Sequence, residues 1–437
     1  MTHNANDVEE YFDSLKFRLR ERLGGRDPIM ILPYNGYGSP DLLYLKGRVL
    51  EDKGIQSARD NDTIWDNLVN MYKRFESDEI PYAQVQATFQ TFQEKYTCDE
   101  EGFFEVHIEP EEPLNRDQPW HEIGLELLKP LRKGYAPVSA QGKVLVPPQT
   151  ARFGVISDMD DTFVRTDATH MIHMARIVFL GNARTRLPFK GVASFYKALN
   201  EGGQGNEQNP LFFVSSSPWN LYDLFSDFLK LQGIPQDPVL FLNDWGFSEQ
   251  GFAANKHRQH KEAVCRRLLN LYKDLPFILI GDSGQQDPEI YNEIVRLNPE
   301  RILAVYIRNV SRGLKRPEAV RELAKKVIEA GSTLILADNT LPMAQHAIEQ
   351  GWISPAAFPE IHAEKKAEEE APTPVEEALG IQVESPKKES PTVVIAGKEP
   401  ERTQSAVAGG AIETALDKAG KDEKEETTAP TVVVKGN

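Results

Sequence analysis

Three aspartates follow directly after a short apolar run near the middle of the chain. Residues 153–156 read Phe-Gly-Val-Ile, and Asp158, Asp160 and Asp161 come next. The run is too short for a helix and follows a proline break, so it predicts a buried strand with the acids at its carboxyl end. Carboxylates this close repel one another unless a cation or a shared proton compensates them, and Mg²⁺ is the simplest such cation. The alternative is an acidic surface turn.

From residue 151 the chain alternates between apolar runs, expected as strands, and segments long enough for helices. The runs are 153–156, 211–214, 239–242, 277–280, 302–306 and 333–336. Repeated units of this kind predict a parallel sheet that is covered on both faces, with strand ends meeting at one edge. Four runs are followed by polar groups, which are Asp158, Ser215, Asp282 and Asp338. This convergence favours a catalytic edge over an acidic turn.

The first acidic stretch resembles the Asp-x-Asp-x-Thr signature of the haloacid dehalogenase-like phosphatases, with Asp158, Asp160 and Thr162 in its three positions. Longer stretches resemble the catalytic domain of the actin patch protein 1 family of phosphatidate phosphatases. They are Ile-Ser-Asp-Met-Asp-Asp-Thr at 156–162, Val-Ser-Ser-Ser-Pro-Trp-Asn-Leu at 214–221, Gly-Asp-Ser-Gly-Gln-Gln-Asp-Pro-Glu-Ile-Tyr at 281–291 and Tyr-Ile-Arg at 306–308. The likeness extends over about 154–352. One departure is Asn243, where the family pattern has an arginine before Asp-Trp-Gly.

The resemblance implies a nucleophilic aspartate that forms an aspartyl-phosphate and a second aspartate that acts as general acid and base. These roles fall on Asp158 and Asp160, while Thr162 would fix the turn that carries them. Mg²⁺ would be held by the Asp158 carboxylate, the main-chain carbonyl of Asp160 and Asp282.

The remaining family positions follow the later strands. Ser215 would hydrogen-bond the phosphoryl group, and Lys261 would offset its developing negative charge. Lys256 is the alternative lysine, and a solvated basic helix start is a third interpretation of this segment. The other expected residues are Asp287 and Ser283 as supports of the lysine and metal ligands, and Ser216, Trp219 and Arg308 as substrate contacts.

Two segments precede the expected phosphatase domain. Residues 1–28 place apolar residues at helical spacing and basic ones in their second half. This predicts an amphipathic helix that packs on a neighbouring domain or lies on a membrane surface. Residues 29–150 contain period-two stretches and predict a small antiparallel β-sandwich, interrupted by a helix near 64–75. The stretches are 42–50, 85–92, 102–108, 125–128 and 143–146.

Residues 151–357 are expected to form a Rossmann-like, haloacid dehalogenase-like domain with a parallel sheet. Its apolar insertion at 171–180 is expected to act as a flap or to pack in the core. Residues 358–437 are rich in Glu, Lys, Ala, Pro, Thr and Ser and predict a disordered acidic tail. Two Val-rich islands, at 391–398 and 430–436, are either docking peptides for a protein partner or a chance recurrence.

Composition limits the class of function. The 437 residues carry a net charge of −16, which argues against a nucleic-acid binder. Cys98 and Cys265 fall in different expected domains and form no disulfide framework, which suits a reducing cytoplasm. The amino terminus does not resemble a secretory signal, and no apolar stretch approaches the ~20 residues of a spanning helix. We therefore expect a cytoplasmic protein whose membrane contact is at most peripheral.

The leading hypothesis is a Mg²⁺-dependent phosphatidate phosphatase. One alternative is a phosphatase of the same mechanism that acts on a soluble or protein-borne phosphate monoester. The other is an interaction protein that uses its β-sandwich and tail, with the phosphatase domain as a scaffold.

Overall fold

The computed structural model describes much of the chain. The described residues are 28–52, 79–131, 135–159, 192–231, 233–234, 237–243, 254–310, 315–370, 393–396 and 432–435. The expected amino-terminal helix, the helix near 64–75 and the apolar insertion lie outside them. Within this part of the chain, no helix is both long enough and apolar enough to cross a membrane.

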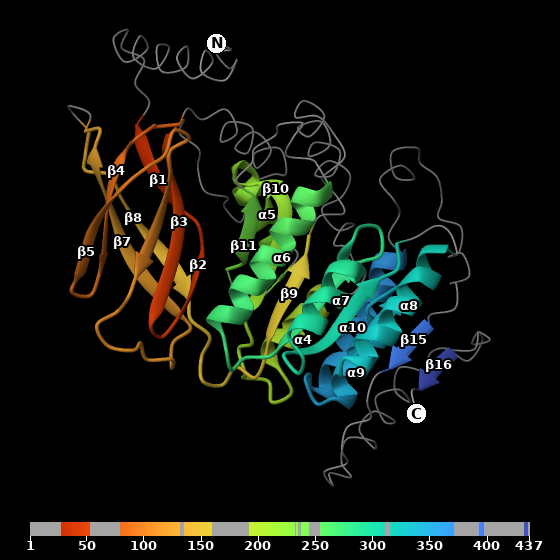
Figure 1. The fold of residues 1–437 in the computed structure, drawn as a ribbon. Helices are drawn as coiled ribbons and strands as arrows, with labels where there is room; N and C mark the ends of the chain where they lie inside the picture. The colour runs from red at the N-terminus through yellow and green to blue at the C-terminus, as the bar shows by residue number, and fades with distance from the viewer. Residues whose placement is uncertain are drawn as a thin grey trace, which may run out of the picture.

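Eight strands form one connected, mainly antiparallel sheet in the amino-terminal domain (Figure 1). They are β1 (Ile29–Pro33), β2 (Gly36–Ser39), β3 (Leu42–Glu51), β4 (Gln84–Phe89), β5 (Phe92–Thr97), β6 (Phe103–Ile108), β7 (Trp120–Lys129) and β8 (Ser139–Leu145). Alternate residues face the core, as Val85, Ala87 and Phe89 of β4 illustrate. The expectation of an antiparallel β domain is confirmed.

One expected strand is a hairpin instead. Residues 85–92 read as a single period-two stretch, but β4 ends at Phe89 and β5 returns from Phe92. Gln90 occupies the turn with a φ of 52°. A residue in this left-handed conformation is usually Gly or Asn. Neither occurs between the two strands, so the sequence pattern does not reveal the turn.

The second domain is built on a six-stranded parallel sheet. Its strands are β9 (Gly154–Asp158), β10 (Leu211–Pro218), β11 (Val239–Asn243), β12 (Phe277–Asp282), β13 (Ile302–Arg308) and β14 (Leu334–Ala337). They lie in the order β11-β10-β9-β12-β13-β14. All six apolar runs expected as strands are confirmed, because strands buried on both faces read as continuous apolar sequence.

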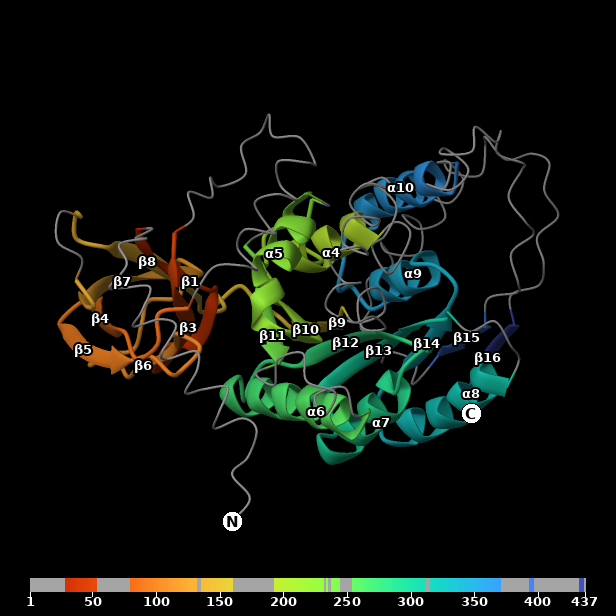
Figure 2. The same ribbon diagram turned by 90° about the horizontal axis from the view of Figure 1, so that it is seen from above.

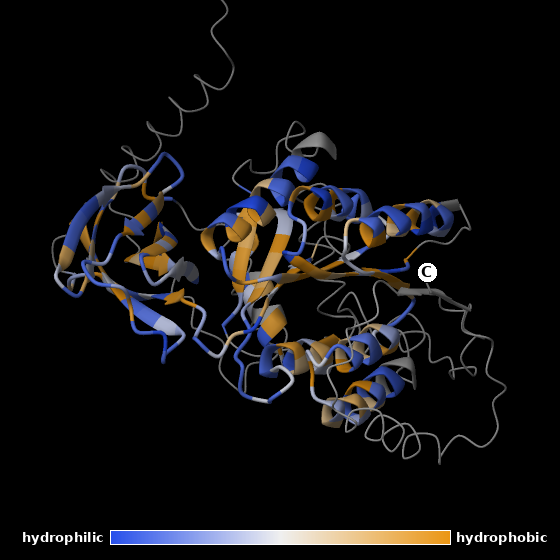
Figure 3. Ribbon diagram, turned by 60° about the horizontal axis from the view of Figure 1, so that its bottom comes forward, coloured by the Kyte–Doolittle hydropathy of each residue, from blue (hydrophilic) through white to orange (hydrophobic). Residues whose placement is uncertain are grey.

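Helices cover both faces of this sheet, as Figure 2 shows. On one face lie α6 (Ala254–Leu271), α7 (Asp287–Leu297) and α8 (Lys315–Glu329), and on the other lie α4 (Val192–Glu201), α5 (Tyr222–Leu231), α9 (Leu341–Glu349) and α10 (Phe358–Glu370). Figure 3 shows apolar strands between helices whose polar sides point outward. The domain therefore has two cores, one on each side of the sheet.

The two domains pack directly against each other. Tyr34, which follows β1, stacks on Trp219 with ring centroids 5.0 Å apart and lies 4.3 Å from the ring of Tyr222. The Tyr222 hydroxyl accepts the Asn35 backbone N–H at 2.8 Å. The β domain therefore contacts the segment that leads from β10 into α5.

The second domain extends past residue 357, where we expected the acidic tail to begin. Helix α10 starts at Phe358, and both Phe358 and Ile361 are buried in the core that it shares with α4 and α9. Further along the expected tail, the two Val-rich islands form β15 (Val393–Ala396) and β16 (Val432–Lys435), which pair in parallel.

Candidate active site

The first acidic residue lies where the strand order of the parallel sheet reverses. Strand β9 is followed along the chain by its neighbour β10 on one side, whereas β12 pairs with β9 on the other side. Open α/β sheets form a crevice at the carboxyl ends of such a pair. Asp158 ends β9 and Asp282 ends β12, so both lie at this reversal.

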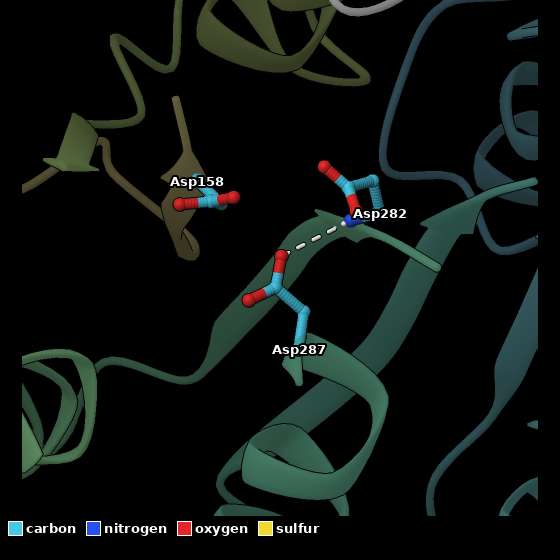
Figure 4. Close-up of side chains that lie close together, drawn as sticks. All are labelled: Asp158, Asp282 and Asp287. Carbon is cyan, nitrogen blue, oxygen red and sulfur yellow. Dashed lines mark hydrogen bonds between the residues drawn. The ribbon is translucent and has the colours of Figure 1, made fainter. Parts of the chain in front are cut away.

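Three buried carboxylates meet at this point (Figure 4). Asp158, Asp282 and Asp287 each offer an oxygen, and these oxygens lie within 4.8 Å of one another. Their residues are 6%, 3% and 0% exposed. Burial of several like charges is costly unless a cation compensates them, and carboxylate oxygens are the ligands that Mg²⁺ prefers. The donor set fits a hard divalent cation.

Lys261 of α6 supplies a positive charge to the same cluster. Its Nζ lies 2.7 Å from Asp158 Oδ1 and 2.8 Å from Asp287 Oδ1, and the lysine is 2% exposed. The structure thus brings the preferred lysine to the acids. Lys256 is the alternative lysine, and its side chain is not among those that the structure describes. Counting these four groups, the cluster keeps a formal charge of −2, which leaves room for a divalent cation.

Asp287 orients its neighbours through both carboxylate oxygens. Oδ2 accepts the backbone N–H of Asp282 at 3.1 Å, while Oδ1 faces Lys261. The close approach requires Gly281, because a Cβ there would lie 2.5 Å from Asp287 Oδ2. Sequence reasoning missed this glycine, although a glycine near the end of a buried strand is a signal for such an approach.

The loop after β12 fixes the Asp282 carboxylate. Its Oδ1 accepts the backbone N–H groups of Gly284 at 2.6 Å and Gln285 at 3.1 Å. The Gln285 side-chain oxygen also accepts a hydrogen bond from Lys261 at 3.3 Å. Sequence reasoning missed Gln285, because nothing in its spacing distinguishes it from a loop residue.

The serines that follow the apolar part of β10 are buried beside β9. Val214 pairs with Asp158 in the parallel register, so Ser215 is placed next to the acidic cluster. Ser215 to Ser217 lie within β10, and the Ser215 hydroxyl accepts the Ser217 backbone N–H at 3.1 Å. Ser216 is 5% exposed. Ser215, Ser216 and Ser217 are therefore buried in the part of β10 that follows its pairing with Asp158.

The other expected residues have different surroundings. Ser283 is buried, and its hydroxyl accepts the Val310 backbone N–H at 3.1 Å. Arg308 ends β13, and its carbonyl accepts the Ser283 N–H at 2.8 Å. Trp219 stacks against Tyr34 of the β domain. Its indole Nε1 is buried without a hydrogen-bond partner among the described residues.

Two predicted residues lie outside the described residues. They are Asp160 and Thr162, which stay predictions. Next to them in the chain, the Ser157 hydroxyl lies 2.5 Å from the Tyr196 hydroxyl of α4, and burial raises the pKa of Tyr196 above its ordinary value. This tyrosine, which sequence reasoning also missed, is therefore neutral at physiological pH and supports the strand that carries Asp158.

Comparison with known proteins agrees with this geometry. Residues 153–309 match the family model described as "Phosphatidate phosphatase APP1, catalytic domain". The chain is 31% identical over 165 residues to phosphatidate phosphatase APP1 of Saccharomyces cerevisiae, which is 37% of this chain and 26% of that protein. It is 28% identical over 159 residues to an uncharacterized protein of Schizosaccharomyces pombe, which is 36% of this chain and 25% of that protein. The chain thus spans about a quarter of the length of these relatives.

Solved structures are similar only at a low level. A carbohydrate acetylesterase from Xanthomonas citri is 10% identical, with a TM-score of 0.25 over 69% of this chain and 66% of that chain. This likeness is too low to support an argument about fold or function. The sequence match, in contrast, includes β9, the serines of β10, Lys261 and the loop after β12. Residues 153–309 are therefore similar to the catalytic domain of the APP1 phosphatidate phosphatases.

Proposed function

We propose that this protein is a Mg²⁺-dependent phosphatase that hydrolyses phosphatidate through an aspartyl-phosphate, with a haloacid dehalogenase-like mechanism. The observation that carries the proposal is the buried cluster in which Lys261 contacts Asp158 and Asp287 beside Asp282. The family match over 153–309 supports the choice of phosphate chemistry and of a lipid phosphate.

Two aspartates carry the covalent and proton-transfer steps of the proposed reaction. The Asp158 carboxylate attacks phosphorus, so that an Asp158–phosphorus bond forms while the bond to the glycerol oxygen breaks. Asp160 gives its proton to the departing oxygen and then takes a proton from the water that hydrolyses the aspartyl-phosphate. Thr162 would hold the turn between strand and acid.

The surrounding groups stabilise the charge that the reaction moves. The Lys261 ammonium lies next to the nucleophile and offsets the negative phosphoryl oxygens. Ser215 and Ser216 would donate hydrogen bonds to the same oxygens. Asp158, Asp282 and the Asp160 carbonyl would hold Mg²⁺, which supplies further positive charge to the phosphate when it is bound.

The substrate class is the second part of the proposal. Trp219 and Arg308 would contact the substrate beyond its phosphate, and a lipid substrate implies peripheral contact with a membrane surface. The alternative is a soluble or protein-borne phosphate monoester, which the same buried cluster would also hydrolyse.

A substrate panel separates these possibilities. Phosphate release should be measured for phosphatidate in mixed micelles, lysophosphatidate, a sugar phosphate and a phosphopeptide, with Mg²⁺ and with EDTA. We expect the highest kcat/KM on phosphatidate and loss of release in EDTA. A clear preference for the sugar phosphate or the phosphopeptide would overturn the lipid assignment, and no release from any substrate would overturn the enzyme assignment.

A further inference from the structure

Arg316 joins the loop after β12 to two helices. It lies in the first turn of α8, and its Nε donates to the Ser283 carbonyl at 2.8 Å. Its Nη2 donates to the Gln285 carbonyl at 2.5 Å. Nη1 and Nη2 also bind the two carboxylate oxygens of Glu289, in the first turn of α7. One guanidinium therefore fixes the loop, α7 and α8 relative to one another.

The place of Arg316 in α8 suits the hydrogen-bonding geometry of its guanidinium rather than its charge. A cation in the first turn of a helix meets the positive end of the helix dipole, so Arg316 does not stabilise α8 by its charge. The planar fork of a guanidinium, in contrast, matches a carboxylate and nearby carbonyls together. Burial raises the pKa of Glu289, but the hydrogen bond from Arg316, a backbone hydrogen bond and the charges of Arg316 and Arg258 together lower the pKa below its ordinary value. The pair is therefore ionised at neutral pH.

The loop that Arg316 holds is the one that orients Asp282. Its carbonyls, at Ser283 and Gln285, face the guanidinium. Its N–H groups, at Gly284 and Gln285, donate to Asp282 Oδ1. Because a peptide unit is planar, fixing the Ser283 carbonyl limits the rotation of the Gly284 N–H in the same peptide unit. The bond to the Gln285 carbonyl holds the same residue whose N–H also donates to Asp282. Arg316 and Asp282 thus lie at the two ends of one chain of contacts.

We propose that Arg316 is a positioning residue for the Asp282 carboxylate. It holds the Ser283 and Gln285 carbonyls, so that the Gly284 and Gln285 N–H groups of this loop keep the carboxylate in one orientation for a divalent cation. The inference rests on the proposed function for the identity of the cation. It predicts that Arg316 changes cation affinity without touching the cation, as supports of metal ligands do.

The chain supplies a matched control in Arg301. Its Nη2 donates to the backbone carbonyls of Leu269, Tyr272 and Leu275, at 3.4, 2.6 and 3.0 Å. Arg301 precedes β13, so it lies at the amino ends of the strands, away from the acidic cluster. Like Arg316, it is an arginine that binds several backbone carbonyls, but these carbonyls do not belong to the loop that orients Asp282.

The test compares Arg316→Gln with Arg301→Gln in the full chain. Calorimetric titration with Mg²⁺ alone, without substrate, gives the dissociation constant, and metal-free hydrogen exchange follows the Gly284 and Gln285 amides. We expect Arg316→Gln to raise the Mg²⁺ dissociation constant by about tenfold or more and to speed exchange at these two amides. Arg301→Gln should leave the Mg²⁺ dissociation constant and the two exchange rates within about twofold of wild type, even if its melting temperature falls as much as that of Arg316→Gln. If Arg316→Gln does not fold, Arg316→Lys replaces it, because it keeps the charge but not the fork.

The outcomes separate this inference from the proposed function. Equal changes in the two variants, no change in Arg316→Gln, or a wild type that binds no Mg²⁺ would overturn the role of Arg316. Phosphate release by wild type together with an unchanged Mg²⁺ affinity in Arg316→Gln would overturn the inference and keep the function. If Arg316→Gln shows the expected shifts but the wild type hydrolyses no phosphate monoester, the role of Arg316 is kept and the proposed function is overturned.

Discussion

At the scale of single residues, the candidate site depends on a buried lysine between two buried carboxylates. Lys261, Asp158 and Asp287 have side chains that are at most 3% exposed. Removing one partner of a buried ion pair leaves the remaining charges uncompensated, which costs far more than the loss of a surface pair. Lys261 therefore stabilises the folded protein as well as the proposed transition state.

Replacing Lys261 by Met should lower the free energy of unfolding by about 3–5 kcal/mol in metal-free buffer. Urea unfolding measures this, with Lys325→Met as the control, because Lys325 is 64% exposed and pairs with Glu322 on the surface. Mg²⁺ should raise the melting temperature of Lys261→Met more than that of wild type, because a cation can compensate the acids that the lysine leaves. Equal stability losses in the two variants would contradict this account of the cluster.

Sequence reasoning identified the residues that motifs and strand ends mark, and the structure brings Asp158, Ser215, Lys261, Asp282 and Asp287 to one sheet edge. It did not identify residues whose roles depend on a contact between separate elements. Arg316 reaches the site from α8, and Tyr196 reaches it from α4. Such contacts leave no periodicity in the sequence and become visible only when the helices are placed.

At the scale of elements, the turn from β12 into α7 packs closely around the acidic cluster. Gly281 and Asp282 are the last two residues of β12, and Asp287 begins α7. A Cβ at Gly281 would lie 2.8 Å from Asp287 Cβ, which is closer than two carbon atoms pack. The turn therefore tolerates only glycine without moving Asp287.

Gly281→Ala should displace Asp287 and lower both Mg²⁺ affinity and phosphate release, at a stability cost of about 1–3 kcal/mol. Gly124→Ala in β7 is the matched control, because its Cβ would meet nothing nearer than 3.6 Å. Activity on p-nitrophenyl phosphate and thermal unfolding should be measured for both. Full activity in Gly281→Ala would show that the close approach to Asp287 is not needed.

The elements themselves were predictable to different degrees. The six parallel strands could be predicted because each contains a continuous apolar run, and four of these runs are followed by a polar group. The strands β1 and β2 were missed, because Ile29–Pro33 and Gly36–Ser39 are short and contain Pro or Gly. The start of α10 was missed because its sequence is mostly charged, and only Phe358 and Ile361 connect it to the core.

At the scale of the whole molecule, the β domain and helix α10 both pack on the domain that carries the candidate site. The β domain stacks Tyr34 on Trp219, four residues after Ser215. Helix α10 closes the opposite end of the same apolar layer, where Glu364 accepts the Ser194 backbone N–H at 2.8 Å. The domain boundary therefore lies beyond residue 357.

Two truncations test this boundary. A chain that ends at Glu370 should keep its melting temperature and its kcat on p-nitrophenyl phosphate within about twofold. In a chain that ends at Ala357, the free energy of unfolding should fall by roughly 3–6 kcal/mol. This truncation removes Phe358 and Ile361 and exposes the apolar surface that they cover. Equal melting temperatures of the two truncated chains would mean that α10 does not belong to the core.

The central claim is that Asp158 is the nucleophile of a phosphatase, and the rate of phosphate release by Asp158→Asn tests it most directly. The amide keeps the shape of the side chain but cannot attack phosphorus. With saturating Mg²⁺ and phosphatidate in mixed micelles, we predict that kcat falls by at least about a thousandfold while circular dichroism shows an unchanged fold. A folded Asp158→Asn variant that releases phosphate within about tenfold of the wild-type rate would contradict the account.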